Sequence, residues 1–182
     1  MNLTETPIRQ TVIYEGKIIT VRVDDARLPN GKTAKREVVE HPGGVCIAAL
    51  TDTDELLFVR QFRYPYAEVI PELPAGKLNR GEDPLPAGMR ELKEETGATA
   101  AHYESLGQLY PSPGYCGEII HLYLATGLSF GVFGGGAYSA AAGGKYGAVR
   151  RDQRRQNPDG GAESLCRPPK AGVTPWHPAK TI

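Results

Sequence analysis

The 182-residue chain contains no apolar run that approaches the roughly 20 residues needed to cross a bilayer. Its first residues, Met1 to Pro7, have neither the basic nor the apolar region of a signal peptide. Both absences argue against a membrane partner and against secretion. The expected location is therefore the cytoplasm.

Cysteine is scarce and its pattern is uninformative. The three cysteines, Cys46, Cys116 and Cys166, are odd in number and lack the spacing of a metal-ligand set. This pattern predicts reduced thiols rather than a disulfide framework or a zinc site. A mass of 19.7 kDa suits a single domain with a hydrophobic core.

The chain also lacks net charge, but the balance conceals an asymmetry. Residues 1–130 contain 13 Lys+Arg and 18 Asp+Glu, whereas residues 131–182 contain 8 and 3. The arginine pairs Arg150-Arg151 and Arg154-Arg155 are of the kind that contacts nucleic-acid backbones. No aromatic stacking platform accompanies them, so nucleic acid is not the expected partner.

One short region concentrates acidic residues at regular spacing. Glu91 and Glu95 are four residues apart, so they lie on the same face of a helix, with Glu94 beside them. Carboxylates grouped in this way repel one another unless a cation neutralises them. Hard oxygen ligands suit Mg²⁺ or Mn²⁺, and Mg²⁺ commonly shares its remaining positions with substrate phosphates. The spacing therefore predicts a metal site and a phosphate-containing substrate.

The same region has helix boundaries. Asp83 is a suitable N-cap, Pro84 suits the first helical position and Gly97 suits a left-handed C-cap. Gly88 is unfavourable in the helix interior by about 1 kcal/mol relative to alanine. Steps of four, three and four residues predict a buried stripe of Leu85, Met89, Leu92 and Thr96.

Apolar runs bounded by turn residues predict strands elsewhere in the chain. Pro29-Asn30-Gly31 is expected to join two of them as a hairpin. Several strands with one strong helix indicate an α+β fold with a mixed sheet. The predicted strands are Thr11–Tyr14, Ile18–Asp25, Ala34–Glu40, Val45–Thr51, Leu56–Phe62 and His121–Ala125.

The acidic region fits a longer pattern, Gly-x5-Glu-x7-Arg-Glu-U-x-Glu-Glu-x-Gly-U, where U is apolar. Because it matches this pattern, the chain resembles the Nudix hydrolases. An ordinary solvated amphipathic helix would account for the acids, but not for the glycines or the arginine. The resemblance implies an α/β/α sandwich around a mixed β-sheet. The matching residues are Gly76, Glu82, Arg90, Glu91, Leu92, Glu94, Glu95, Gly97 and Ala98.

The flanks of this motif resemble the ADP-ribose pyrophosphatase branch of the family, over roughly residues 8 to 130. Pro113 lies fifteen residues beyond Ala98, where that branch has a proline. The resemblance implies hydrolysis of a nucleoside diphosphate sugar, with ADP-ribose giving AMP and ribose 5-phosphate. It also implies a homodimer in which the N-terminal hairpin region, residues 1–42, is exchanged between subunits. A relative that cleaves nucleoside triphosphates is an alternative.

The resemblance assigns roles to particular residues. Mg²⁺, or Mn²⁺, would be held by Glu82, Glu91, Glu94, Glu95 and the carbonyl of Ala75. Arg90 would take part in catalysis by orienting a glutamate of the motif through an ion pair.

Three further residues are candidates for binding substrate. Arg36 and Arg63 would bind the diphosphate through their guanidinium groups, the alternative being ordinary positions on the surface of strands. Glu118 would bind ribose hydroxyls or a metal-bound water, the alternative being a solvated loop acid.

The resemblance ends near Phe130, after which the implied acidic loop, strand and helix cannot be recognised. We expect a hydrolase domain at residues 43–130 and a disordered tail at residues 131–182, which contains ten glycines. A change of translational reading frame in a GC-rich gene would produce this shift in composition, and a functional tail is the alternative. No acid occurs between Glu118 and Asp152, so the general base expected there is missing. The enzyme hypothesis therefore stands beside that of a weak or inactive nucleotide-binding relative.

Overall fold

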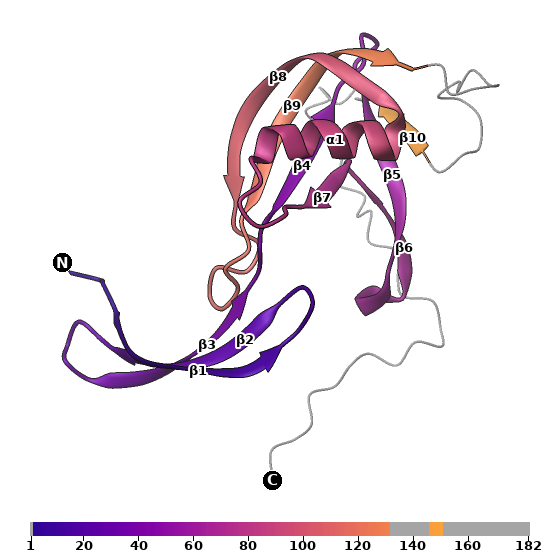
Figure 1. The fold of residues 1–182 in the computed structure, drawn as a ribbon. Coiled ribbons are helices and arrows are strands. Elements are labelled where there is room, and N and C mark those ends of the chain that lie inside the picture. Colours follow the sequence, from indigo (N-terminus) through magenta and orange to yellow (C-terminus); the bar gives the residue numbers. More distant parts are fainter. Residues whose placement is uncertain (1, 132–145, 151–182) are drawn as a thin grey trace, which may run out of the picture. The chain divides into compact units, whose positions relative to one another are not determined.

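The computed structural model describes residues 2–131 in full and the backbone of residues 146–150, all within one compact unit, Met1–Arg151 (Figure 1). The predicted disorder and frame change of the tail fall mainly on residues 132–145 and 151–182, outside the described residues. In chain order the elements are β1 (Thr6–Glu15), β2 (Thr20–Arg27), β3 (Thr33–Glu40), β4 (Gly44–Ala49), β5 (Glu55–Arg63), the 3₁₀ turn η1 (Tyr64–Tyr66), β6 (Glu68–Glu72), β7 (Ala75–Lys77), α1 (Pro84–Thr96), β8 (Ala98–Leu109), β9 (Ile120–Phe130) and β10 (Tyr146–Arg150).

The strands form three sheets, ordered β1-β2-β3, β10-β5-β6 and β7-β4-β9-β8. The last of these is mixed, because β4 runs parallel to β9 while the other pairs are antiparallel. The α+β class with a mixed sheet is therefore confirmed. In the part of the chain that the structure describes, α1 is the one α-helix, and it is too short and too polar to span a membrane.

The N-terminal sheet is a meander whose hairpin follows the sequence prediction. Gly31 has a φ of 81°, which glycine adopts without strain, and its N–H donates to the carbonyl of Leu28. Backbone hydrogen bonds attach this sheet to the loop before β9, since Val39 donates to Tyr115 and Gly117 donates to Val39. The whole of β1 is exposed.

Helix α1 begins and ends where the sequence predicts. The Asp83 carboxylate accepts a hydrogen bond from the N–H of Leu85 at 3.1 Å, and Gly97 closes the helix with a φ of 71°. The predicted buried stripe is partly wrong, because the Met89 side chain is 45% exposed. Leu85 and Thr96 are only half-buried.

The helix instead buries Ala87, Gly88 and Leu92. A Cβ atom on Gly88 would lie 2.6 Å from Ile47 Cδ1 and 2.9 Å from Val45 Cγ2. The absence of a side chain at this position therefore allows the helix to approach β4 closely, and small residues determine which face is turned inward. The core cluster contains Val45, Ile47, Ala49, Leu57, Leu78, Ala87, Leu92, Ala98 and Ala125.

Four strands were not predicted: β6, β7, β8 and β10. The strand β8 is rich in alanine and almost wholly exposed, so neither its composition nor its burial favours a strand in isolation. Pairing with β9 imposes the extended conformation. The segment expected to be a disordered tail includes β10, a strand that was not recognised in the sequence and whose backbone pairs antiparallel with β5. An open strand edge offers backbone donors and acceptors to such a segment whatever its composition.

Candidate active site

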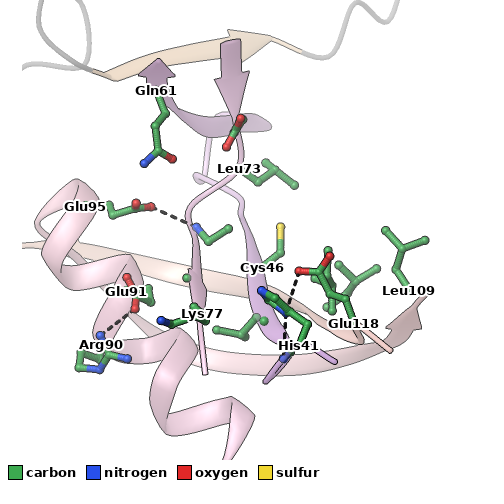
Figure 2. Close-up of a pocket in the computed structure, with 18 of the residues that line it drawn as sticks. His41, Cys46, Gln61, Leu73, Lys77, Arg90, Glu91, Glu95, Leu109 and Glu118 are labelled. Carbon is green, nitrogen blue, oxygen red and sulfur yellow. Dashed lines mark hydrogen bonds and ion pairs between the residues drawn. The ribbon is translucent and has the colours of Figure 1, made fainter. Parts of the chain in front are cut away.

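A cavity of about 910 Å³ lies between the mixed sheet, helix α1 and the β5–β6 hairpin (Figure 2). Its lining includes six of the residues singled out in the sequence as site residues: Arg63, Ala75, Arg90, Glu91, Glu95 and Glu118. The fold therefore brings together residues from β5, β7, α1 and the loop before β9.

Glu91 occupies the space beside a glycine that has no room for a side chain. A Cβ atom on Gly76 would lie less than 3.0 Å from three atoms of the Glu91 side chain. Because Gly76 has no side chain, β7 leaves room for the Glu91 carboxylate to pack against it. This contact explains why the motif has a glycine fifteen residues before a glutamate that it touches in space.

Glu95 lies one helical turn further along, beside β7. Its Oε2 accepts a hydrogen bond from the N–H of Ala75 at 3.1 Å (Figure 2). Burial raises the pKa of Glu95 above its ordinary value, against the lowering effect of that hydrogen bond. The negative charges of Glu91 and Glu72 raise this pKa further. Burial and the neighbouring carboxylates thus destabilise the charged form of Glu95.

Arg90 joins the acids of the motif. Its Nη1 donates to Glu91 Oε1 at 2.7 Å and to Glu94 at 3.4 Å, and its Nη2 donates to Glu82 at 3.3 Å. The hydrogen bond from the backbone of Asn79, with help from Arg90, lowers the pKa of Glu82. Hydrogen bonding to Glu91 raises the pKa of Arg90. The arginine thus contacts three carboxylates of the motif.

Arg63, which also lines the cavity, is engaged in a similar way. Its Nε donates to Glu72 Oε1 at 2.7 Å, and a second bond joins Nη2 to Oε2. The two residues come from neighbouring strands, β5 and β6, and both line the cavity. Arg63 therefore reaches the cavity as one half of a bidentate pair.

The far end of the cavity contains His41 and Glu118. The N–H of Gly43 donates to His41 Nδ1 at 3.1 Å, so this nitrogen serves as an acceptor. Glu118 Oε1 lies 3.4 Å from the same nitrogen. Among the residues that the structure describes, Glu118 is close to His41 but has no arginine partner, and it borders the cavity.

Three of the residues predicted for the site do not line the cavity. Arg36 lies on β3 and makes two hydrogen bonds to Glu5, at 2.9 and 2.7 Å. Glu94 projects from α1 with a side chain that is 60% exposed, and Glu82 binds Asn79 and Arg90. Within this chain, the structure does not bring these three to the cavity.

Of the residues predicted to bind a metal ion, Ala75, Glu91 and Glu95 line the cavity. Among the residues that the structure describes, no group of three or more His, Cys, Asp or Glu side chains is arranged to hold a metal ion. Glu91 and Glu95 nevertheless both border the cavity with hard oxygen ligands, and the Glu91 charge raises the pKa of Glu95. A divalent cation between them would relieve that repulsion, so the donor set fits such an ion.

Residues that the sequence did not assign to the site also line the cavity, among them Cys46, Gln61 and Lys77. Cys46 is the register partner of Ala75, and burial beside Glu72 and Glu95 raises its pKa to about 11. Strand pairing of this kind has no signature in the sequence. Lys77 did have a signal, because it directly follows the motif's first glycine.

Comparisons with known proteins agree on one family. The model described as "NUDIX domain" matches residues 40–130, and the model described as "Nucleoside diphosphate sugar hydrolase N-terminal domain" matches residues 5–39. An ADP-ribose pyrophosphatase of Bacillus subtilis (strain 168) is 47% identical over 128 residues, which cover 70% of this chain and 69% of that protein. A methanol dehydrogenase activator of Bacillus methanolicus is 47% identical over 125 residues, covering 69% and 68%.

Two further matches are more distant. An ADP-ribose pyrophosphatase of Mycobacterium tuberculosis (strain ATCC 25618 / H37Rv) is 41% identical over 66% of this chain and 59% of its own length. A solved structure titled "Crystal structure of ADP compounds hydrolase" aligns with a TM-score of 0.65 at 22% identity, covering 82% of this chain and 79% of that one. This structural likeness supports the fold alone.

Proposed function

Because the chain belongs to the NUDIX family, we propose that it hydrolyses the diphosphate of ADP-ribose or a related nucleoside diphosphate sugar. Water adds to one phosphorus and the bridging P–O bond breaks, so ADP-ribose gives AMP and ribose 5-phosphate. The observation that carries the proposal is the meeting of Glu91, Glu95 and Arg63 around one cavity. The N-terminal match and two relatives named as ADP-ribose pyrophosphatases support the choice of substrate.

The proposal includes a divalent cation, which we take to be Mg²⁺, with Mn²⁺ as a substitute. Within the cavity, Glu91, Glu95 and the carbonyl of Ala75 would bind it. Glu82 and Glu94, which hydrogen-bond to Arg90 outside the cavity lining, would add negative charge near the cation. When bound, the cation supplies charge neutralisation for the diphosphate and an acidified water. The chain's own residues must then position both carboxylates, and Gly76 and the Ala75 N–H do so by direct contact.

Arg90 is proposed as a positioning residue. Its guanidinium bridges Glu91 and Glu82, which come from the helix and from the loop before it. Removing this bridge would free the Glu91 carboxylate to leave the cavity. Arg90 would thereby act through Glu91 rather than through substrate.

Arg63 and Glu118 are proposed to bind substrate. Arg63 can direct a guanidinium towards phosphate oxygens if the diphosphate competes with Glu72 for its N–H groups. Glu118 also lines the cavity, with a carboxylate that accepts hydrogen bonds, as ribose hydroxyls would require. The lining thus offers donors for the diphosphate and an acceptor for the ribose of a nucleoside diphosphate sugar.

Arg36 fits the proposal only if a second subunit is present. Its strand belongs to the N-terminal sheet, where β1 exposes Ile8, Val12, Ile13 and Tyr14 by more than half of each side chain. We propose a homodimer in which this sheet, within residues 1–42, packs against the partner subunit and residues 43–130 form the hydrolase domain. Burial of those apolar side chains would stabilise the pair.

A second candidate function is nucleotide binding with weak turnover. The observation that favours it is the lack of any Asp or Glu between Glu118 and Asp152, where the family resemblance implies a general base. General-base assistance is worth about 10²–10⁴-fold in rate. A chain without that base would bind metal and substrate yet release AMP slowly.

The proposal is tested by AMP release from ADP-ribose in Mg²⁺, measured by chromatography, for Glu91→Gln and Glu95→Gln. We expect turnover to fall by about 10²-fold or more, because a neutral amide is a poor ligand for Mg²⁺. Glu104→Gln is the matched control, because Glu104 is exposed on β8 and does not line the cavity. Unchanged turnover in both cavity variants would overturn the metal assignment. Tight binding of ADP-ribose by a wild-type protein that releases no AMP would favour the second candidate.

A further inference from the structure

Lys77 differs from the other basic residues of the cavity in that its side chain has no partner within the described part of the chain. Arg63 is held by Glu72, and Arg90 is held by Glu91, Glu94 and Glu82. Lys77 lines the same cavity and is exposed, and its side chain makes no hydrogen bond or ion pair with any described residue. Its ammonium group is therefore free to bind an anion.

We infer that Lys77 binds phosphate oxygens of the diphosphate substrate and sets the affinity of the cavity for it. This inference rests on the proposed function for the identity of the substrate. It adds a residue that is neither an acid of the metal site nor one of the two arginines already assigned.

Strand geometry places the Cβ atom of Lys77 and the Cβ position of its neighbour Gly76 on opposite faces of β7. Successive side chains of a strand point to opposite faces. Gly76 faces Glu91, so Ala75 and Lys77 share the other face of β7. In the view of Figure 2, Lys77 is drawn between the pair Arg90–Glu91 and the pair His41–Glu118. The lysine thus belongs to the cavity but not to the ion-pair network of Arg90.

The charges of the cavity give this lysine its importance. Once Arg63 is paired with Glu72 and Arg90 with Glu91, the acids that still line the cavity are Glu95 and Glu118, and their charges repel an anionic substrate. The two arginines are already neutralised by carboxylates, and a metal ion would be shared with Glu91 and Glu95. An unpaired ammonium on a flexible four-carbon stem is then the protein group best able to contact a phosphate as a point charge.

Such a contact would form in the substrate complex and persist in the transition state. Removing it should therefore raise KM while leaving kcat nearly unchanged. For Lys77→Met, which retains much of the apolar stem, we expect KM for ADP-ribose to rise about 10-fold, with kcat within about 2-fold of wild type. Lys77→Arg keeps the charge and should recover most of the affinity. Lys93→Met is the matched control, because Lys93 is exposed on α1 and does not line the cavity.

The second measurement needs no variant. The full-length wild-type protein in Mg²⁺ is treated briefly with an amine-acetylating reagent, with and without inorganic pyrophosphate, and the modified lysines are mapped by mass spectrometry. Pyrophosphate should protect Lys77 at least several-fold and leave Lys93 unprotected. Equal acetylation of Lys77 in both conditions would overturn the inference, even if Lys77→Met failed to fold. A wild-type KM in a folded Lys77→Met variant would overturn it as well.

The two proposals can fail separately. If wild-type protein does not hydrolyse ADP-ribose but pyrophosphate protects Lys77, the proposed function fails and the phosphate contact stands. If ADP-ribose is hydrolysed and Lys77 is unprotected, the function stands and the role of Lys77 is refuted.

Discussion

Replacing Gly76 by alanine should damage the site while sparing the fold. The new Cβ atom would lie under 3.0 Å from the Glu91 carboxylate, whereas ordinary contact begins at 3.4 Å. Because Glu91 is the far end of a flexible side chain, it can retreat, and the retreat required is on the order of 1 Å. An off-rotamer side chain costs on the order of 0.5–1.5 kcal/mol, and alanine offsets part of this by restricting the unfolded chain.

The effect on catalysis should be much larger than the effect on stability. A displacement of about 1 Å at a catalytic group can reduce the rate on the order of 10²-fold. The Arg90–Glu91 ion pair at 2.7 Å would be disturbed by the same movement. We therefore expect Gly76→Ala to lose about 10²-fold in kcat/KM for ADP-ribose, with a melting temperature within a few degrees of wild type.

The assay pairs AMP release in Mg²⁺ with thermal unfolding followed by far-ultraviolet circular dichroism. Gly114→Ala is the control, because a Cβ atom there meets open space and its φ is not in the left-handed region. A folded Gly76→Ala protein with wild-type kcat/KM would refute the view that Gly76 makes room for the Glu91 carboxylate.

Two other perturbations test the packing and the electrostatics separately. Gly88→Ala should lower the free energy of unfolding, measured in urea. Overpacking against Ile47 and Val45 costs about 1–3 kcal/mol, which outweighs the helix-propensity gain of about 1 kcal/mol. An increase in stability would contradict the close approach of α1 to β4. Cys46, whose pKa is raised to about 11 by burial and by Glu72 and Glu95, should be alkylated by iodoacetamide far more slowly than Cys116 at pH 8, with a rate that climbs as pH rises towards 11. Equal alkylation of the two thiols, followed by mass spectrometry, would contradict that environment.

Most of the fold could be predicted from the sequence because the caps, turns and apolar runs that define its elements are local in the chain. The caps of α1 and the turn at Gly31 depend on residues that are neighbours in the chain, and these predictions are confirmed. The strands with continuous apolar runs, such as β4 and β5, are also found. Local chemistry was sufficient wherever the structure is decided by the chain's immediate neighbours.

The wrong or missing predictions concern features that depend on contacts between elements distant in the sequence. The inward face of α1 is decided by how near β4 can come, and the helix sequence alone favoured the larger Met89 over Ala87 and Gly88. The strands β8 and β10 owe their conformation to partners distant in sequence, β9 and β5. A pattern within one segment contains no information about such a partner.

The candidate site divides along the same line. Acids at helical spacing predicted a shared face, and Glu91 and Glu95 do border one cavity. The binding of Arg90 to three of the motif's acids, and of Arg63 to Glu72, depends on contacts between elements and was only partly foreseen. The unpaired state of Lys77 could be recognised only after every other cation in the cavity had been given its partner.

The two glycines of the motif region have a common physical explanation. Helix α1 lies so close to β4 and β7 that a side chain on Gly88 would meet β4, and a side chain on Gly76 would meet the helix's own Glu91. The first glycine allows the backbone of the helix to approach the sheet, and the second keeps open the space that this approach leaves for a carboxylate. A helix held further from the sheet would move Glu91 and Glu95 away from Ala75 and from the cavity. The spacing of the acids along α1 therefore produces a site only because both glycines allow α1 to pack closely against the sheet.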